Sequence, residues 1–437
     1  MFPTYLARRV LVISIQVGLL HLILLPPAMA APGELDTTFG GDGRVVTEFG
    51  ACCPSASGVA IQADGKVVVA GSVRSASDGG RFALTRYKRN GALDATFGAD
   101  GRVVTGFTGR GAGASAVAIQ ADGKIVAAGS VCCPSRKLNV ALARYNRNGA
   151  LDATFGGDGR VVTGFAHDAV ADGVAIQSDG RIVAAGWVSS PSGERKMALA
   201  RYKPGGALDA TFGGDGRVTT GFAGDAFATG VAIQSDGKVV AAGGLFPAAN
   251  FRQRVVLARY NPSGALDATF GGDGRVTTGF AGDVLAEGLA IQSDGRIVAA
   301  GSLFPNGKQR FALVRYRSNG ALDASFGGDG RVATAFAGNA NGSAVTIQVD
   351  GKIVVAGATA LPERTPKFAL ARYRQSGALD GTFGGDGRVV TGFAGRASAE
   401  GVAIQPDGRI VAAGGLFHVP LAPPGKDRFA LARYVAT

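Results

Sequence analysis

The chain has 437 residues, including 70 glycines, and carries a formal net charge of +12 at neutral pH. Hydrophobic residues make up 46% of the chain and charged residues 18%, which excludes intrinsic disorder, because disordered chains are poor in apolar residues and rich in charge. The glycines follow no period of three, which excludes a collagen-like triple helix.

Residues 1–30 have the composition of an export signal. The segment lacks acidic residues, carries Arg8 and Arg9, continues through the apolar stretch 10–25 and ends in Ala28-Met29-Ala30. A positive start, an apolar middle and small residues at the end are typical of a secretory signal peptide. We predict cleavage after Ala30, which leaves residues 31–437 with a net charge of +10 because two arginines are removed. The alternative is an uncleaved membrane anchor, for which the apolar stretch is short, since a span needs about 20 residues.

The rest of the chain consists of seven copies of one unit. The tract Leu-Asp-Ala-Thr-Phe-Gly-Gly-Asp-Gly-Arg recurs with small changes every 56 to 58 residues, starting at Leu35, Leu93, Leu151, Leu208, Leu266, Leu322 and Leu379. Three apolar tracts follow in each unit; in the third copy they are residues 173–177, 181–186 and 197–202. They are rich in Val, Ile and Ala and are separated by Asp-Gly turn signals, a pattern typical of short strands joined by hairpins.

A period near 57 with four strands and no helical pattern indicates a β-propeller rather than a helical or leucine-rich array. We predict an all-β fold, a single seven-bladed β-propeller of four-stranded blades over residues 31–437. The array starts with an outer strand at 44–49 and ends with a third strand at 429–434. The N-terminal outer strand should therefore pair with the C-terminal blade and close the ring.

Three of the recurring tracts resemble a known repeat family. Ala-Ile-Gln-Ser-Asp-Gly-Arg-Ile-Val-Ala-Ala-Gly, Phe-Ala-Leu-Ala-Arg-Tyr and Gly-Ala-Leu-Asp-Ala-Thr-Phe-Gly-Gly-Asp-Gly-Arg-Val are similar to the delta-60 repeat of bacterial exported β-propeller proteins over residues 35–434. The order of the tracts is more distantly similar to that of NHL-type propellers. The resemblance implies the propeller fold and a secreted, periplasmic or cell-surface location in a bacterium. It implies no catalytic residue, because that family has no established activity to carry over.

Residues that recur in all copies predict structural roles, because a catalytic site needs unlike residues that converge at one place. The repeated aspartates should fix turns or pair with the repeated arginines within each blade. The repeated phenylalanines should fill the seams between blades. The glutamines that end the inner strands should satisfy backbone groups at the hairpins, with a ring at the channel mouth as the alternative. The glutamines are Gln62, Gln120, Gln177, Gln234, Gln292, Gln348 and Gln405.

Binding specificity is expected where the copies differ, and two connections differ most. One joins the outer strand to the next inner strand and the other joins the second strand to the third, so alternating strand directions place both on one face. The second-to-third connections carry the ligand-binding candidates Trp187, Phe246, Phe304, Phe417, Arg254, Arg310 and Arg428. Aromatic rings beside cations suit stacking on sugars and contact with anions. The alternative is that the rings cover loop interiors and the cations are only solvated.

The other variable connections carry acids, and each of the two cysteine pairs lies in a variable connection on the same face. Asp168, Asp225 and Asp283 are weak candidates for a cation site, with solvated acids as the alternative. Cys52, Cys53, Cys132 and Cys133 form two vicinal pairs and are disulfide candidates in an exported protein. Cross-links between the pairs, bridges within each pair and a zinc site all remain open.

The material for catalysis is thin, because residues 31–437 contain only His167 and His418 and no triad, haem or phosphate-loop motif. We predict a secreted, non-enzymatic binding or scaffold module with no cofactor, which acts as a monomer. Its expected partner is an anionic polysaccharide, the cell envelope or a protein, with no specific nucleic acid and no membrane span after cleavage. The alternatives are a carboxylate-based enzyme acting on extracellular polysaccharide through Asp168, Asp225 and Asp283, and a structural surface protein with no specific ligand.

Overall fold

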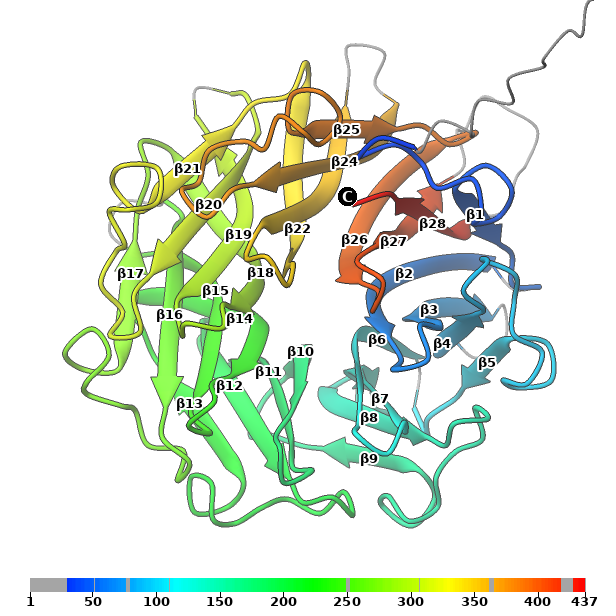
Figure 1. The fold of residues 1–437 in the computed structure, drawn as a ribbon. Coiled ribbons are helices and arrows are strands. Elements are labelled where there is room, and N and C mark those ends of the chain that lie inside the picture. The colour runs from blue at the N-terminus through cyan, green and yellow to red at the C-terminus, as the bar shows by residue number, and fades with distance from the viewer. Residues whose placement is uncertain are drawn as a thin grey trace, which may run out of the picture.

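The computed structural model describes residues 30–50, 52–75, 79–109, 111–248, 252–305, 307–360, 365–417 and 427–436. Over these residues the chain forms seven four-stranded antiparallel sheets, arranged as blades around a central axis (Figure 1). The predicted seven-bladed β-propeller is confirmed. Of the predicted signal peptide only Ala30 lies within the described residues. Within the described ranges, no helix is long and apolar enough to cross a membrane.

Each blade has an inner, a second, a third and an outer strand, and the blades are numbered by their inner strands. The inner strands are β2 (Cys52–Ile61), β6 (Gly111–Ile119), β10 (Ala169–Ile176), β14 (Gly224–Ile233), β18 (Asp283–Ile291), β22 (Asn339–Ile347) and β26 (Arg396–Ile404). The second strands are β3 (Val67–Ser75), β7 (Ile125–Cys132), β11 (Ile182–Ser189), β15 (Val239–Pro247), β19 (Ile297–Phe304), β23 (Ile353–Ala360) and β27 (Ile410–Phe417). The third strands are β4 (Gly79–Tyr87), β8 (Leu138–Tyr145), β12 (Arg195–Tyr202), β16 (Arg254–Tyr260), β20 (Arg310–Tyr316), β24 (Pro366–Tyr373) and β28 (Arg428–Tyr434). The outer strands are β5 (Arg102–Thr105), β9 (Arg160–Thr163), β13 (Arg217–Thr220), β17 (Arg275–Thr278), β21 (Arg331–Thr334), β25 (Arg388–Thr391) and β1 (Arg44–Thr47).

The ring closes through its two chain ends, as predicted. β1 pairs antiparallel with β28, and the sheet order of blade 7 is β1-β28-β27-β26. Asp36 forms an ion pair with Arg433 at 2.9 Å, and Leu35 bridges to Tyr434. Because these contacts join the first and last repeats, no blade of the ring is left with three strands.

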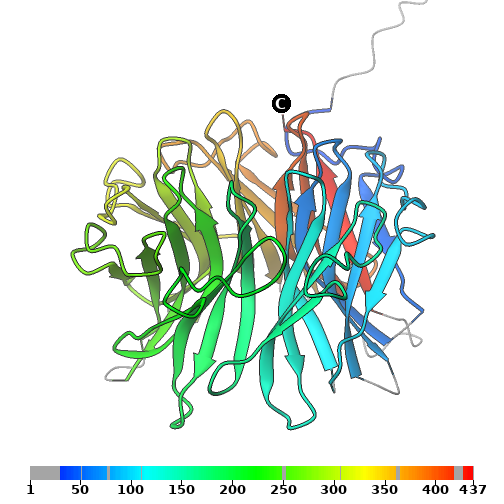
Figure 2. The same cartoon turned by 90° about the horizontal axis from the view of Figure 1, so that it is seen from below.

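The second and third strands form the buried middle of each blade. In β11, residues from Ile182 to Gly186 are buried without interruption, as expected for strands covered by neighbouring blades on both faces. A methyl group on Gly186 would lie 2.0 Å from the carbonyl oxygen of Val170, so only glycine permits this approach of the inner strand. Figure 2 shows the ring edge-on, with the connections gathered at its two faces.

The inner strands are longer than the repeated Gly-Val-Ala-Ile-Gln tract predicts. β10 begins at Ala169, and its first half pairs with β11 before a β-bulge between Ala171 and Gly173. Here alternate small residues, Ala169 and Ala171, are buried against blade 2, while the residues between them are half-buried. Because only the buried positions require small side chains, the other positions vary between copies, and the sequence of this half resembles a loop.

The repeated residues form the seams between blades. In each blade the third-strand arginine forms an ion pair of 2.7–2.9 Å with the aspartate of the Leu-Asp tract. The guanidinium carbon lies 4.6–4.8 Å from the centroid of the repeated phenylalanine. Phe97, for example, is fully buried between strands of blades 1 and 2. The tyrosine that ends each third strand bonds to a threonine on the outer strand of the preceding blade, as Tyr260 does with Thr220 at 2.7 Å. The structural roles predicted for the repeated Asp, Arg and Phe are therefore confirmed.

Candidate functional site

The two variable connections lie on one face, which we call the variable face. At four places an acidic or amide side chain of one blade accepts a hydrogen bond from a backbone N–H of the preceding blade. The pairs are Leu138 to Asp168 at 2.8 Å, Arg195 to Asp225 at 2.6 Å, Gln253 to Asp283 at 3.0 Å and Gln309 to Asn339 at 3.1 Å. These bonds tie the entrance of each third strand to the next blade. Because the donors and acceptors come from the two variable connections, both connections share this face.

Asp168, Asp225 and Asp283 therefore serve as links between blades. Within the described ranges, no group of three His, Cys, Asp or Glu side chains could hold a metal ion. The structure thus gives each of the three carboxylates a separate partner and does not bring them together. Asp225 and Asp283 also lie on the inner strands β14 and β18, where the sequence predicts connections.

Trp187 and Phe246, both predicted candidates, come together around Arg195. The Arg195 guanidinium carbon lies 5.7 Å from the ring centroid of Trp187, 4.8 Å from that of Phe227 and 5.9 Å from that of Phe246. Its Nε and Nη2 donate to the carboxylate of Asp225 at 2.8–3.1 Å. This aromatic cluster fixes one cation at the junction of blades 3 and 4. Phe227 is a member that sequence reasoning missed, because it lies in the variable half of an inner strand.

Phe304 and Phe417 remain accessible on the variable face. Each ends a second strand and is more than one-third exposed, at 37% and 36%. Phe417 is the direct cross-strand partner of Arg396, so the two side chains leave the sheet on the same side. Phe304 is in the same way opposite Asp283. These rings are available for contact with a ligand, whereas Phe246 packs on Phe227 with centroids 5.9 Å apart.

A groove of about 550 Å³ crosses the variable face beside these residues, and we call it the basic groove. Lys308 and Arg310 come from blade 5, Asn339 and Pro366 from blade 6, and Arg396 from blade 7. Among the described residues that line the groove, three are basic and none is acidic. The arrangement can therefore hold an anionic group that bridges blades.

The three predicted arginines divide between different environments. Arg310 lines the basic groove. Arg428 forms an ion pair of 2.6 Å with Glu48 at the ring closure. Arg254 begins the third strand of blade 4, the position equivalent to Arg310, but it does not line the groove. Only one of the three therefore lines the groove, and Lys308 and Arg396 are groove residues that sequence reasoning missed.

The cysteines are in different states. Cys53 is disulfide-bonded, whereas Cys132 and Cys133 have free thiols. The Asn139 side-chain amide donates to Sγ of Cys133 at 2.7 Å. The second pair is thus not cross-linked to the first in this structure.

The inner strands carry a second set of chemically distinctive residues, which we call the axial residues. Each inner strand has a β-bulge, and the unpaired residues at the bulges are Ser57, Ser115, Asp172, Thr229, Glu287, Ser343 and Glu400. Bulges re-aim a side chain away from the regular alternation. All seven side chains are hydroxyls or carboxyls, while the flanking residues are mostly Ala, Gly and Val.

Three axial carboxyl groups influence one another electrostatically. Burial, together with the charges of Glu400 and Asp172, raises the pKa of Glu287 to about 7. Burial raises the pKa of Asp172 to about 6, against the opposing charge of Arg195. Burial also raises the pKa of Glu400, although hydrogen bonds with Ser398 and Ser343 oppose the effect. Because the three acids belong to blades 7, 5 and 3, which are not neighbours, they interact across the axis.

Sequence reasoning missed these carboxyl groups. The available signal was the position before Gly-Val-Ala, which is acidic in three copies and hydroxylic in four. This pattern does not reveal the β-bulge, which is the feature that changes the direction of the side chain at this position.

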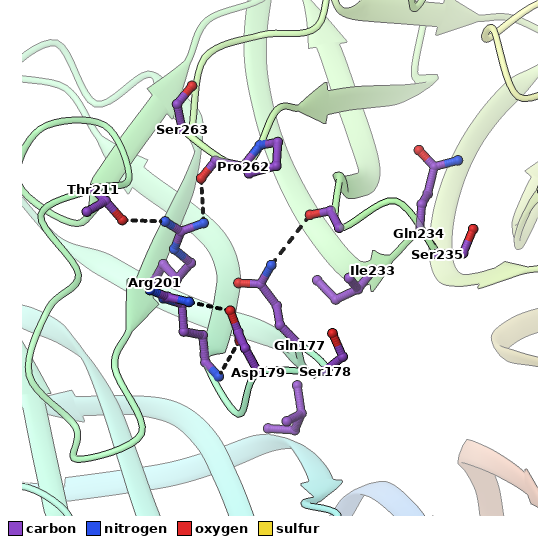
Figure 3. A pocket seen from close by; sticks show the side chains of 13 residues that line it. Gln177, Ser178, Asp179, Arg201, Thr211, Ile233, Gln234, Ser235, Pro262 and Ser263 are labelled. Carbon is purple, nitrogen blue, oxygen red and sulfur yellow. Dashed lines mark hydrogen bonds and ion pairs between the residues drawn. The ribbon is translucent and has the colours of Figure 1, made fainter.

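The opposite face, which we call the repeated face, carries the hairpins common to all copies. Between blades 3 and 4 a cavity of about 810 Å³ is lined by Gln177, Arg201 and Thr211 (Figure 3). Arg201 donates to the Pro262 carbonyl of the next blade at 2.6 Å and to Thr211 at 2.9 Å. The Gln177 amide donates to the Gly237 carbonyl of the next blade at 3.4 Å. These bonds hold adjacent blades together, as the predicted backbone-satisfying role of the glutamines requires.

The fold and these surfaces define a class, the β-propeller repeat proteins. Six segments, residues 62–97, 120–155, 177–212, 234–270, 292–326 and 348–383, match the family described as Domain of unknown function (DUF5122) beta-propeller. These six segments are similar to that family, and the chain as a whole is a β-propeller repeat protein. No curated protein matches the chain.

Solved structures share the fold at low sequence identity. An ulvan lyase described as a new family of polysaccharide lyase, bound to -[GlcA(1-4)Rha3S]-, is 10% identical with a TM-score of 0.50, over 90% of this chain and 96% of its own. A catalytically inactive virginiamycin B lyase from Staphylococcus aureus is 11% identical with a TM-score of 0.49, over 89% and 98%. A protein of unknown function from Dyadobacter fermentans is 10% identical with a TM-score of 0.43, over 90% and 98%. At these identities the likeness extends to the propeller fold alone.

Proposed function

We propose that the protein is an exported, non-enzymatic binding module, built of delta-60-type repeats, that holds an anionic polysaccharide of the bacterial cell envelope on its variable face. The basic groove carries this proposal. It gathers Lys308, Arg310 and Arg396 from two blades, with no acidic residue among its described lining.

The groove has the chemical features that an acidic sugar polymer requires. Arginine binds carboxylate and sulfate groups in a bidentate manner, and such charge-assisted hydrogen bonds are roughly twice as strong as neutral ones. The exposed ring of Phe417 lies beside Arg396 and offers an apolar surface for the face of a pyranose. The net charge of +10 that remains after cleavage draws polyanions toward the molecule before specific contacts form.

The alternative is a carboxylate-based enzyme acting on extracellular polysaccharide, and the positions of its predicted residues do not favour it. Asp168, Asp225 and Asp283 each accept a backbone hydrogen bond from the preceding blade through Oδ1, and the three lie at separate junctions between blades. A general acid–base pair must instead converge on one substrate. The likeness to a polysaccharide lyase at 10% identity extends to the fold and lends this alternative no residue.

The test is calorimetric binding of residues 31–437 to alginate, a polyuronate, and to dextran sulfate, with neutral dextran as the control ligand. We expect saturable binding of at least one polyanion that persists at 150 mM salt. The variant Arg310→Ala should weaken this binding about tenfold, as expected for one charge-assisted contact. Arg254→Ala is the matched control, because it removes the same residue type at the equivalent strand position outside the groove.

Two results would overturn the proposal. The first is binding that salt abolishes, which would leave only diffuse charge attraction. The second is an equal effect of Arg310→Ala and Arg254→Ala, which would show that the groove has no special role.

A further inference from the structure

A cavity of about 550 Å³ lies on the repeated face, where the inner strands of blades 6, 7 and 1 end. We call it the axial mouth, because the inner strands surround the axis of the ring (Figure 1). Its walls are Ile61, Ile347 and Ile404, the last residues of β2, β22 and β26. This cavity is remote from the basic groove, which lies on the other face.

The rim of the axial mouth is apolar in this sector of the ring and in the adjoining blade 2, where Ala121 follows Gln120. The residue after the glutamine is Ala63, Val349 or Pro406 in blades 1, 6 and 7, and all three line the cavity. The equivalent residues of blades 3, 4 and 5 are Ser178, Ser235 and Ser293. Val349 is completely exposed, so its side chain packs on nothing in the described chain. The exposed side chain of Val349 is therefore available for contact with a ligand.

The cavity also holds buried acceptors without donors. Gln62 and Gln348 line it, are more than nine-tenths buried, and have side-chain oxygens with no hydrogen-bond partner. In blade 7 the corresponding oxygen of Gln405 accepts from Arg433 at 3.3 Å. An unpaired buried carbonyl oxygen is unfavourable, so a ligand that offers N–H donors here gains by pairing it.

The axial carboxyl groups lie deeper along the same strands. Glu400 precedes the wall residue Ile404 by four positions in β26, which is about 13 Å along a strand. Glu287 and Asp172 share the axial space with Glu400, and Arg195 is the cation that acts on Asp172. Glu287 therefore faces negative neighbours, and the hydroxyls of Ser398 and Ser343 bond to Glu400. This space favours a positively charged guest.

We propose that the axis binds an elongated aliphatic diamine or polyamine that enters at the axial mouth. One ammonium group donates to the side-chain oxygens of Gln62 and Gln348, and the hydrocarbon chain lies against the three isoleucines. The second ammonium group is the counter-charge of Glu287, Glu400 and Asp172. This site is independent of the proposed function, since it uses the opposite face and a ligand of opposite charge.

The test is calorimetric titration of residues 31–437 with 1,10-diaminodecane at pH 8, since a ten-carbon chain between ammonium groups spans roughly the distance from mouth to carboxyls. We expect one saturable site. The double variant Glu287→Gln/Glu400→Gln should weaken binding at least tenfold, and decylamine, with one ammonium group, should bind at least tenfold more weakly. Val349→Ser should weaken binding, whereas Ser235→Ala, at the equivalent rim position of blade 4, is the matched control and should not.

A second readout is the number of protons exchanged on binding, measured at pH 7 in buffers of different ionisation enthalpy. The diamine should displace protons from the axial carboxyl groups, so net proton release is expected from the parent and not from the double variant. Absence of binding, or binding that the double variant leaves unchanged, would overturn the proposal. Melting curves of each variant show whether the ring is intact. Alginate binding by the double variant is measured as well, so that failure of the axial site and failure of the basic groove can be distinguished.

Discussion

Glu287 provides a test of the electrostatics along the axis. Burial and the charges of Glu400 and Asp172 raise its pKa from 4.5 to about 7 in the folded protein. One pH unit of difference between folded and unfolded pKa values corresponds to about 1.4 kcal/mol, so the ionised group destabilises the fold by roughly 3 kcal/mol above pH 7.

The sign of the pH dependence follows from proton binding. Between pH 4.5 and 7 the folded state holds a proton at Glu287 that the unfolded state has lost, so stability falls as pH rises through this window. The variant Glu287→Gln removes the ionisation. It should therefore be more stable than the parent by about 2–3 kcal/mol at pH 8, and close to the parent at pH 4.5.

Differential scanning calorimetry measures this difference. For a domain of about 400 residues the gain corresponds to a rise of about 3 °C in the melting temperature at pH 8. Glu194→Gln makes the same chemical change at an exposed turn between β11 and β12. This control variant should leave the melting temperature unchanged both at pH 4.5 and at pH 8. A gain from Glu287→Gln that is equal at both pH values, or no gain at pH 8, would refute the reasoning, because the effect must follow ionisation.

Two further predictions concern the seams. Deletion of residues 35–49 removes β1 and leaves Arg433 buried without Asp36, which should lower stability by about 3–5 kcal/mol and split the calorimetric melt into more than one transition; a single unchanged transition would contradict the closure. Tyr260→Phe removes the hydroxyl that bonds to Thr220 and should cost about 1 kcal/mol in urea unfolding, and an unchanged midpoint would show that the seam bond contributes nothing.

The parts of the fold that depend on repeated side chains were predictable from the sequence. The Leu-Asp tract, the third-strand arginine and the buried phenylalanine recur because every seam needs the same ion pair and the same ring. Ring closure also followed from the sequence, because the repeat array starts and ends out of phase with its blades. The pairing of β1 with β28 confirms it.

The candidate sites depend on features that leave weaker traces in the sequence. The first halves of the inner strands resemble loops, because only alternate positions, such as Ala226 and Ala228 in β14, are constrained by packing. The sequence therefore assigns Asp225 to a connection and does not draw attention to Phe227. Likewise, a β-bulge is an irregularity of backbone pairing, so the axial position of Glu287 is revealed by the structure and not by the sequence.

The closure of the ring determines the order in which the strands can pair during synthesis and folding. Thr38 and Arg433, which hydrogen-bond in the folded protein, are 395 positions apart in the chain. A polypeptide that emerges N-terminus first must hold its first strand unpaired while six blades assemble behind it. A chain cut short before β28 would keep two open sheet edges, which are templates for aggregation and sites for proteolysis. The pairing of β1 with β28 can therefore form only after the complete repeat array has been synthesised.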